Sequence, residues 1–224
     1  MEKRFLVIGA GRFGSSVIKE LHTLGNEVVA CDLDEDLLLD VDDYVNHSII
    51  GDATDSRVLE ELNATDFDAV VVSIGDNFEA AILTLKNLKD MGCEQVYLKA
   101  NDKKRGEVLS AVGADRVIYP EEETGIRVAK QLATPGMIEF VELAPNFGAM
   151  EVNVPESFYG KNLIELNFRR KYGLIVVMVS KVNKATPIVS PKPELVFEEG
   201  DVMFVIGEND DLQKLQKKLH RDAQ

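Results

Sequence analysis

The chain has 224 residues, a length that fits one or two domains with a substantial hydrophobic core. Hydrophobic residues make up 45% of the sequence and charged residues 29%, as in ordinary globular proteins. The net charge of −14 disfavours nonspecific binding to nucleic acid or to an anionic membrane surface. The longest apolar runs, such as Leu174–Val179, are too short to cross a bilayer, and no signal peptide is expected. Cys31 and Cys93 are isolated, which is typical of buried free thiols in a reducing cytoplasm.

A phosphate-binding loop is predicted at the start of the chain. Arg4–Ile8 has the composition of a short buried strand, the glycine-rich segment Gly9–Gly14 follows at once, and Ser15–Leu24 has helical spacing. Asp32 directly follows the next apolar run, Val28–Cys31. A strand, a glycine loop, a helix, a second strand and a terminal acid in one short segment predict a nucleotide-binding βαβ unit.

The residue types in this loop indicate how a ligand would be held. Gly9 permits a tight turn, Gly11 lets the backbone approach a pyrophosphate, and Gly14 allows the helix to pack against the strand. Arg12 is placed to bind phosphate oxygens bidentately, which suits ADP or ATP as well as NAD; the alternative is a solvated side chain. Asp32 is expected to accept the ribose hydroxyls and to repel a 2′-phosphate, so NADP is disfavoured.

The first 120 residues repeat the order of strand and then helix. Further strands are predicted at residues 45–50, 69–73, 95–99 and 116–119, and further helices at residues 56–62, 78–91 and 103–112. Six strands that alternate with helices predict an α/β fold with a Rossmann-like, doubly wound parallel sheet.

Ligands of such sheets bind beyond the carboxyl ends of the strands. Lys99 at one strand end is expected either to contact phosphate or to hold an acid on the rim of the site. Asp34 and Asp76 follow other strands, and for both the alternative role is the capping of a helix. The residues predicted to bind nucleotide are Gly9, Gly11, Arg12, Phe13, Gly14, Asp32, Leu33, Asp34, Asp52, Ala53, Ile74, Gly75, Asp76, Lys99, Ala100, Asn101, Arg105 and Glu121.

Three consecutive acids, Glu121–Glu123, begin a predicted helix that extends to about Leu132. Acids in a first turn complement the helix dipole, which explains them without any ligand. Glu121 also lies at the predicted ligand edge, where a carboxylate repels phosphates unless a divalent cation bridges the two. The second interpretation therefore makes Glu121 a ligand of Mg²⁺ or Ca²⁺.

The pattern changes after Thr134–Gly136, a break that contains Pro135. Beyond it, strands are predicted at residues 137–143, 150–154, 174–180 and 201–206, helices at residues 163–171 and 209–219, a turn at residues 145–148 and a loop at residues 187–193. The predicted organisation is a nucleotide-binding domain at residues 1–120, a crossover helix and linker at residues 121–140, and a smaller α+β domain at residues 141–224.

Catalytic groups are not apparent in the sequence. His22, His47 and His220 do not stand at the predicted ligand edge beside a partner acid, and no Cys–His or Ser–His–Asp arrangement is visible. This favours nucleotide sensing over catalysis.

Several motifs extend beyond the glycine loop, and they are Phe5–Gly14, Gly51–Thr54, Val72–Gly75, Val112–Glu121 and Arg170–Gly173. With these motifs the whole chain resembles the RCK (regulator of conductance of potassium) proteins, the cytosolic gating subunits of Ktr/Trk-type bacterial potassium uptake systems. It is most similar to the KtrA/KtrC group.

The resemblance implies a Rossmann-like protein that is not an enzyme and that forms homodimers assembled into an octameric ring. Such a ring lies in the cytoplasm, on the inner face of the membrane, below a membrane-embedded potassium-translocating subunit. ATP opens the gate in this family, ADP closes it, and NAD(H) can also bind. By resemblance, Arg12 contacts phosphate, Asp32 the ribose and Asp52 with Ala53 the base, and Glu121 holds a divalent cation or the terminal phosphate near a subunit boundary.

The second half resembles the RCK C-terminal domain, which in several relatives binds cyclic di-AMP at a dimer interface. The matching stretches are Leu163–Arg169 and Ile175–Val177, with Pro191 downstream. Asn167 replaces an Asp and Ile175 stands where an Asn is common, which counts against cyclic di-AMP as a ligand without excluding it.

Two other classes of function stay open. One is a small NAD-dependent oxidoreductase, which turnover of NADH with carbonyl compounds would favour. The other is a nucleotide-sensing regulator of a different partner, such as a redox-sensing repressor. The net charge of −14 and the absence of a basic DNA-reading helix from the sequence count against the repressor.

Overall fold

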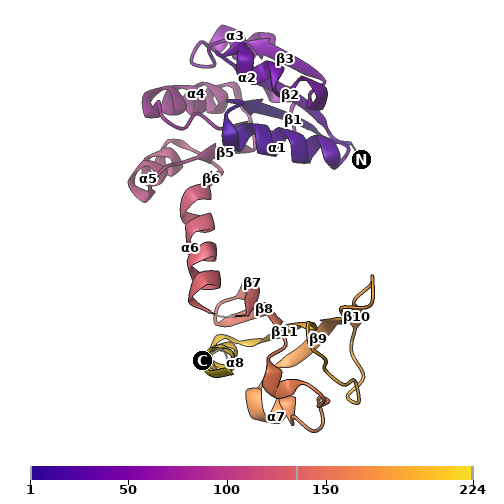
Figure 1. The fold of residues 1–224 in the computed structure, drawn as a ribbon. Helices are drawn as coiled ribbons and strands as arrows, with labels where there is room; N and C mark the ends of the chain where they lie inside the picture. The colour runs from indigo at the N-terminus through magenta and orange to yellow at the C-terminus, as the bar shows by residue number, and fades with distance from the viewer. Residues whose placement is uncertain (1, 135, 223–224) are drawn as a thin grey trace. The chain divides into compact units, whose positions relative to one another are not determined.

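The computed structural model describes residues 2–134 and 136–222, and the chain divides into two units, Met1–Glu122 and Glu123–Gln224 (Figure 1). Helix α6, Pro120–Ala133, contains the division. The predicted boundary between residues 140 and 141 falls inside strand β7, Met137–Ala144. Pro135, part of the predicted break, lies outside the described residues. None of the described helices is long and apolar enough to cross a membrane.

The first unit contains a six-stranded parallel sheet with the order β3-β2-β1-β4-β5-β6. This order confirms the predicted doubly wound sheet. The chain first winds from β1 toward β3 and then from β4 toward β6, so the direction reverses between β1 and β4, where such folds bind ligands. The strands are β1 Arg4–Ile8, β2 Glu27–Asp32, β3 His47–Ile50, β4 Ala69–Val72, β5 Val96–Lys99 and β6 Arg116–Ile118.

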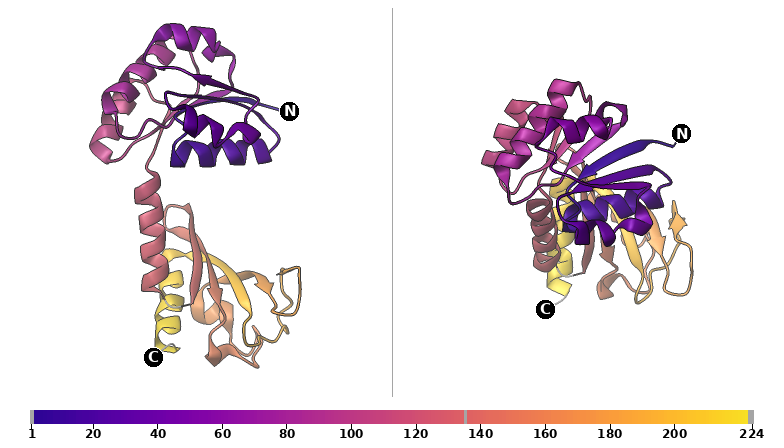
Figure 2. Two further views of the ribbon diagram at one scale, coloured as in Figure 1. Left: turned by 45° about the horizontal axis from the view of Figure 1, so that its top comes forward. Right: turned by 90° about the horizontal axis from the view of Figure 1, so that it is seen from above.

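Helices cover both faces of this sheet (Figure 2). Because successive side chains of a strand point to opposite faces, Leu6 and Ile8 of β1 belong to one buried cluster and Val7 to another. The first cluster includes residues of α3 Ser56–Glu61, α4 Phe78–Met91 and α5 Lys103–Val112, and the second includes residues of α1 Arg12–Thr23 and α2 Glu35–Leu39.

The first unit differs from the sequence prediction near its helix starts. Helix α1 begins at Arg12 and not at Ser15, so the end of the glycine loop forms its first turn. Helix α2 was not predicted, because its five residues are too few to show a helical period. Two short 3₁₀ turns, Asp42–Tyr44 and Ala64–Asp66, precede β3 and β4.

The second unit contains a five-stranded antiparallel sheet with the order β10-β9-β11-β8-β7. Its core includes Phe158, Phe197, Met203 and the inward face of α8, where Leu212 and Leu215 are buried. Besides β7, the strands are β8 Phe147–Asn153, β9 Ile175–Ser180, β10 Ile188–Val189 and β11 Val202–Glu208; the helices beyond α6 are α7 Phe168–Tyr172, α8 Asn209–Asp222 and the 3₁₀ turn Glu156–Phe158.

The predicted helix at residues 163–171 is wrong over its first half. Asn162 Oδ1 accepts a hydrogen bond from the Glu165 amide while Glu165 Oε2 accepts one from the Asn162 amide, which imitates a helix start. Asn167 then adopts the left-handed conformation with φ 46°, and regular helix begins only at Phe168. The predicted loop at residues 187–193 contains the short strand β10.

Candidate nucleotide-binding site

The glycine loop between β1 and α1 has the geometry that its sequence predicts. Gly9 has φ +95°, and a Cβ there would lie 3.0 Å from the Ser73 carbonyl carbon and oxygen. A Cβ on Gly14 would lie 1.8 Å from the Gly9 carbonyl oxygen, so only glycine fits beneath the turn. A Cβ on Gly11 would meet nothing within 4 Å, which leaves open space beside the backbone at the start of α1.

Asp32 at the end of β2 is fixed by two backbone hydrogen bonds. Its Oδ2 accepts from the Ala10 amide at 2.6 Å, and its Oδ1 accepts from the Asp34 amide at 3.0 Å. Each carboxylate oxygen has a second lone pair, so Asp32 can still accept hydrogen bonds from two ribose hydroxyls. The carboxylate is therefore already oriented before a ligand binds.

An inner cavity of about 260 Å³ lies at the point where the strand order reverses. Asp32 lies at this cavity together with Leu33, Asp52 and Ala53. A mainly apolar cavity with a few polar groups is typical of nucleoside sites. Its lining residues are Ile8, Gly9, Gly11, Cys31, Asp32, Leu33, Leu37, Gly51, Asp52, Ala53, Ser73, Ile74, Gly75, Asn77 and Ala80.

An outer cavity of about 480 Å³ shares Gly11, Ser73 and Gly75 with the inner cavity. Arg12 and Lys99 bring positive charge to it, and the start of α1 supplies free backbone amides. Its lining residues are Gly11, Arg12, Phe13, Ser73, Gly75, Asp76, Lys99, Asn101 and Glu121. The inner cavity thus fits a nucleoside, and the outer cavity fits its phosphates.

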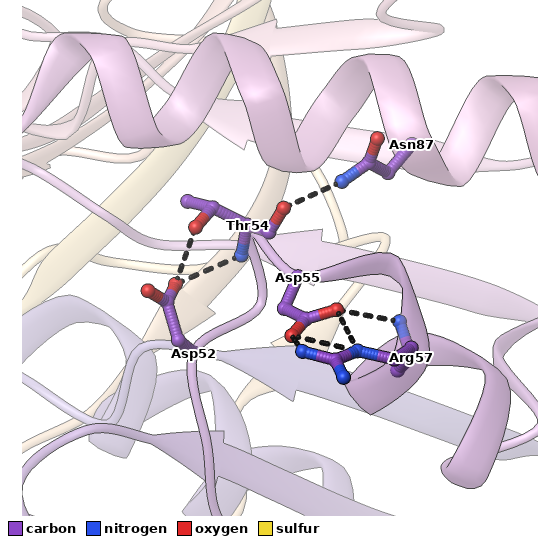
Figure 3. A network of polar contacts seen from close by, with 5 residues as sticks. All are labelled: Asp52, Thr54, Asp55, Arg57 and Asn87. Carbon is purple, nitrogen blue, oxygen red and sulfur yellow. Dashed lines mark hydrogen bonds and ion pairs between the residues drawn. The ribbon is translucent and has the colours of Figure 1, made fainter.

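The loop after β3 is held by a network of polar contacts (Figure 3). Asp52 Oδ1 accepts from the Thr54 amide at 2.9 Å and from the Thr54 hydroxyl at 2.7 Å. Asn87 of α4 donates to the Thr54 carbonyl at 2.9 Å, and Asp55 pairs with Arg57 at the start of α3. Asp52 Oδ2 takes no part in these two hydrogen bonds, and Asp52 lines the inner cavity.

Glu121 lies in the first turn of α6 and forms an ion pair across the rim of the outer cavity. Its Oε1 accepts from Lys99 Nζ at 2.7 Å; the Lys99 side chain is 15% exposed and the Glu121 side chain 66%. The hydrogen bond from Lys99 is the main cause that lowers the pKa of Glu121 below its usual value, and the charge of Arg12 also contributes. Two roles were predicted for Lys99, contact with phosphate or the holding of an acid on the rim of the site, and the structure shows the second.

No group of three or more His, Cys, Asp or Glu within residues 2–134 and 136–222 is arranged to hold a metal ion. Glu121 and Asp76 are the carboxylates at the outer cavity, and oxygen ligands of this kind suit Mg²⁺ or Ca²⁺ when phosphate oxygens complete the coordination.

Four described residues of the predicted site line neither cavity, and one of them is Gly14, which lies beneath the turn at Gly9. Asp34 caps α2, accepting from the Asp36 amide at 3.0 Å, which was its alternative role. Arg105 lies 5.3 Å from the centre of the Phe78 ring and pairs with Asp102. Ala100 directly follows β5 and is buried in the core of the first unit. Asp76 lines the outer cavity, whereas its neighbour Asn77 caps α4.

Sequence reasoning missed several residues of the inner cavity. Ser73 lies in the motif Val72–Gly75 but was not assigned to the site, and Ala80 carried no signal of its own. Asn77 could have been found as the cap that precedes a predicted helix. Cys31 is fully buried, and burial together with the charges of Asp32 and Asp52 raises the pKa of its thiol to about 11. The remaining missed residues are Ile8, Leu37 and Gly51.

The second unit has a separate cavity of about 260 Å³, lined mostly by residues of Leu163–Arg169 and Ile175–Val177, the stretches that resemble cyclic di-AMP binding domains. Arg169 and Ile175 both lie at this cavity. The other lining residues are Leu163, Ile164, Phe168, Leu174, Val176 and Pro193.

Comparison with known proteins identifies two domains in the chain. The TrkA-N domain matches residues 5–120 and the TrkA-C domain matches residues 149–220. The chain is 36% identical to Ktr system potassium uptake protein C of Bacillus subtilis over 98% of both chains. It is 34% identical to Ktr system potassium uptake protein A of Vibrio alginolyticus, over 97% of this chain and 98% of the relative.

Solved structures agree with this fold. The GsuK RCK domain superposes with a TM-score of 0.68 at 19% identity, over 98% of this chain and 48% of that chain. The GsuK channel bound to NAD superposes with a TM-score of 0.66 at 18% identity, over 96% of this chain and 39% of that chain. Together with the sequence matches, these likenesses confirm the predicted resemblance: the chain belongs to the RCK family of potassium transport proteins, built from a TrkA-N and a TrkA-C domain.

Proposed function

We propose that this chain is the nucleotide-sensing regulatory subunit of a Ktr/Trk-type potassium transporter and is not itself an enzyme. The observation that carries the proposal is the pair of adjoining cavities, one beside Asp32 and one beside Arg12 and the start of α1. Their sizes and polar groups suit an adenosine and its phosphates. Relatives at 32% and 36% identity are named Ktr system potassium uptake proteins, which supports the transport role.

ATP and ADP are the proposed regulatory ligands, with ATP activating and ADP inhibiting, and NAD(H) can occupy the same site. Arg12 in the first turn of α1 favours a ligand with dense phosphate charge. A fold relative, the GsuK channel, was solved with NAD, which supports a dinucleotide as a further ligand. A nucleotide can move the protein between two shapes only if it binds them with different affinities.

A divalent cation is the proposed link between Glu121 and the phosphates. The outer cavity brings Glu121 and Asp76 beside the position of the phosphates, and like charges there repel each other. Mg²⁺ or Ca²⁺ with oxygen ligands removes that repulsion. Glu121 belongs to α6, so an event at the phosphates acts directly on the helix that leads into the second unit.

Assembly of the chain is part of the proposal. Helix α6 carries exposed apolar side chains, with Ile126 at 49%, Val128 at 43% and Leu132 at 81% exposure, and Ile138 of β7 is also exposed. This surface supports a homodimer, and the family supports a larger, octameric ring of dimers. The ring would act from the cytoplasm on a membrane-embedded potassium-translocating subunit.

The test is potassium flux into liposomes that hold the membrane partner and this subunit, with ATP or ADP, with and without Mg²⁺. We expect higher flux with ATP than with ADP, and a Mg²⁺ dependence that Glu121→Gln loses while it retains nucleotide binding. Glu122→Gln is the matched control, because Glu122 is the next acid of α6 and pairs with Lys103 instead.

Equal flux with ATP and ADP in the wild type would contradict the gating role. Equal Mg²⁺ dependence in the wild type and in Glu121→Gln would leave Glu121 as an acid of the first turn, with no role toward a cation. Light scattering tests the assembly separately, since a monomer at micromolar concentration with and without ATP contradicts the ring.

A further inference from the structure

The outer cavity carries opposite charges that cancel. Arg12 and Lys99 contribute positive charge, and Asp76 and Glu121 contribute negative charge. A polyphosphate brings several negative charges of its own. Such a ligand gains little electrostatic binding energy from a cavity with no net charge unless one of the four side chains changes its partner.

Lys99 is the side chain whose partner can change. Its stem is mostly buried, with 15% exposure, which fixes the ammonium group at the cavity. A Cβ on Gly75 would lie 3.6 Å from Lys99 Nζ, and Gly75 lines both cavities. The ammonium group therefore lies near the junction of the two cavities, within reach of a phosphate chain that extends from a ribose at Asp32.

Glu121 is the partner that can leave. Its side chain is 66% exposed, so water can solvate the carboxylate as soon as Lys99 releases it. Ion pairs with an exposed member contribute little to stability, whereas a buried ammonium gains more from a phosphate oxygen. The exchange of Glu121 for phosphate is therefore favourable once the ligand is present.

We propose that Lys99 selects nucleotides by their phosphate chain, and that it does so by exchanging Glu121 for a phosphate oxygen. This inference rests on the proposed nucleotide site and names the residue that reads the phosphates there. Glu121 imitates the phosphate while the outer cavity is empty of ligand, and it competes with the nucleotide for Lys99. The exchange frees the carboxylate in the first turn of α6, so phosphate occupancy changes what holds the start of this helix.

The experiment is calorimetric titration of the full chain with adenosine, ADP and ATP in EDTA, which removes the effect of divalent cations. Lys99→Met should weaken the affinity for ATP by about ten-fold or more, the loss expected for one charged hydrogen bond, and leave the affinity for adenosine unchanged. Glu121→Gln should strengthen the binding of ATP several-fold, because the competitor for Lys99 is gone. In the Lys99→Met background, Glu121→Gln should give a smaller gain.

Lys103→Met is the matched control, because Lys103 also pairs with an acid in the first turn of α6, Glu122 at 2.9 Å, but does not line the outer cavity. It should bind ATP as the wild type does. Unchanged adenosine binding in every variant shows that the fold is intact. If Lys99→Met fails to fold, the ATP affinity of Glu121→Gln still tests the exchange, because Glu121 is exposed and its replacement should not disturb the fold.

Four results would overturn the inference. Unchanged ATP affinity in Lys99→Met, or no gain in Glu121→Gln, refutes the exchange while the nucleotide site stands. Equal wild-type affinity for adenosine and ATP shows that the phosphates are not recognised. If wild-type protein binds neither ATP nor adenosine, the proposed function itself fails and the inference fails with it.

Discussion

Replacement of Asp32 by alanine tests the nucleotide site most directly, because the structure separates its effect on folding from its effect on binding. Asp32→Ala removes the acceptor for two backbone amides. Ala10 is 2% exposed, so its amide loses a partner that water cannot replace, at a cost of about 1–3 kcal/mol. The Asp34 residue is exposed, so water can satisfy its amide at little cost.

The effect on binding adds to the effect on folding. A carboxylate that accepts from the ribose contributes about 1.5–3 kcal/mol, so ATP, ADP and NADH should all bind roughly 10- to 150-fold more weakly. All three ligands share the adenosine ribose, so the loss should be similar for each. Arg12→Ala should instead weaken the binding of these ligands through lost contacts with their phosphates.

Isothermal titration calorimetry measures the affinities, and urea unfolding measures the stability. Asp34→Ala is the matched control: it removes the cap of α2, about 1 kcal/mol, but Asp34 does not line the inner cavity, so nucleotide affinity should be retained. Unchanged affinity for all three ligands in Asp32→Ala would refute the assignment of the ribose to this carboxylate.

Three further outcomes are expected. Gly14→Ala should prevent a folded first unit, because the new Cβ would lie 1.8 Å from the Gly9 carbonyl oxygen; a wild-type circular dichroism melt would contradict this. Asn87→Ala should cost about 1 kcal/mol of stability and weaken adenosine binding several-fold, since it frees the Thr54 carbonyl; unchanged calorimetry would remove its positioning role. The raised pKa of Cys31, about 11 against an ordinary 9.0, means that its stabilising effect is complete below pH 9 and is lost as the pH rises through 11. Between pH 9 and 11, the free energy of unfolding measured in urea should therefore fall by up to about 3 kcal/mol more in the wild type than in Cys31→Ala. An equal fall in both proteins would contradict the raised pKa.

Helices with a residue signal at both ends could be predicted with their bounds. Asn77 and Gly92 cap α4, and Asp102 and Gly113 cap α5, so the sequence carries both limits of each helix. Helix α2 has an N-cap but too few residues for a period. The error at residues 163–171 has the opposite cause, because a local start signal was present and the left-handed residue that ends it was not recognisable in advance.

The residues of the candidate site also divide into those that the sequence predicts and those that it does not. Asp32 and the glycine loop could be predicted because their roles depend on positions close together in the sequence. Ala80 reaches the inner cavity only through the packing of α4 in the folded unit, which no local pattern records. Arg105 was expected at the ligand because of its place near a strand end, but the direction of its side chain depends on the Phe78 ring, which lies far from it in the sequence.

The separate cores of the two units have a consequence for measurements of heat stability. Within residues 2–134 and 136–222, each buried cluster draws its residues from one unit: two clusters from Met1–Glu122 and one from Glu123–Gln224. A nucleotide that binds the first unit raises that unit's melting transition by mass action, and the second unit need not follow, so one melting temperature does not describe the chain. The sequence has no Trp, and of its five Tyr residues Tyr44, Tyr97 and Tyr119 lie in the first unit, with Tyr159 and Tyr172 in the second. Tyrosine emission therefore mixes both transitions, and a single Trp introduced into one unit would report that unit alone.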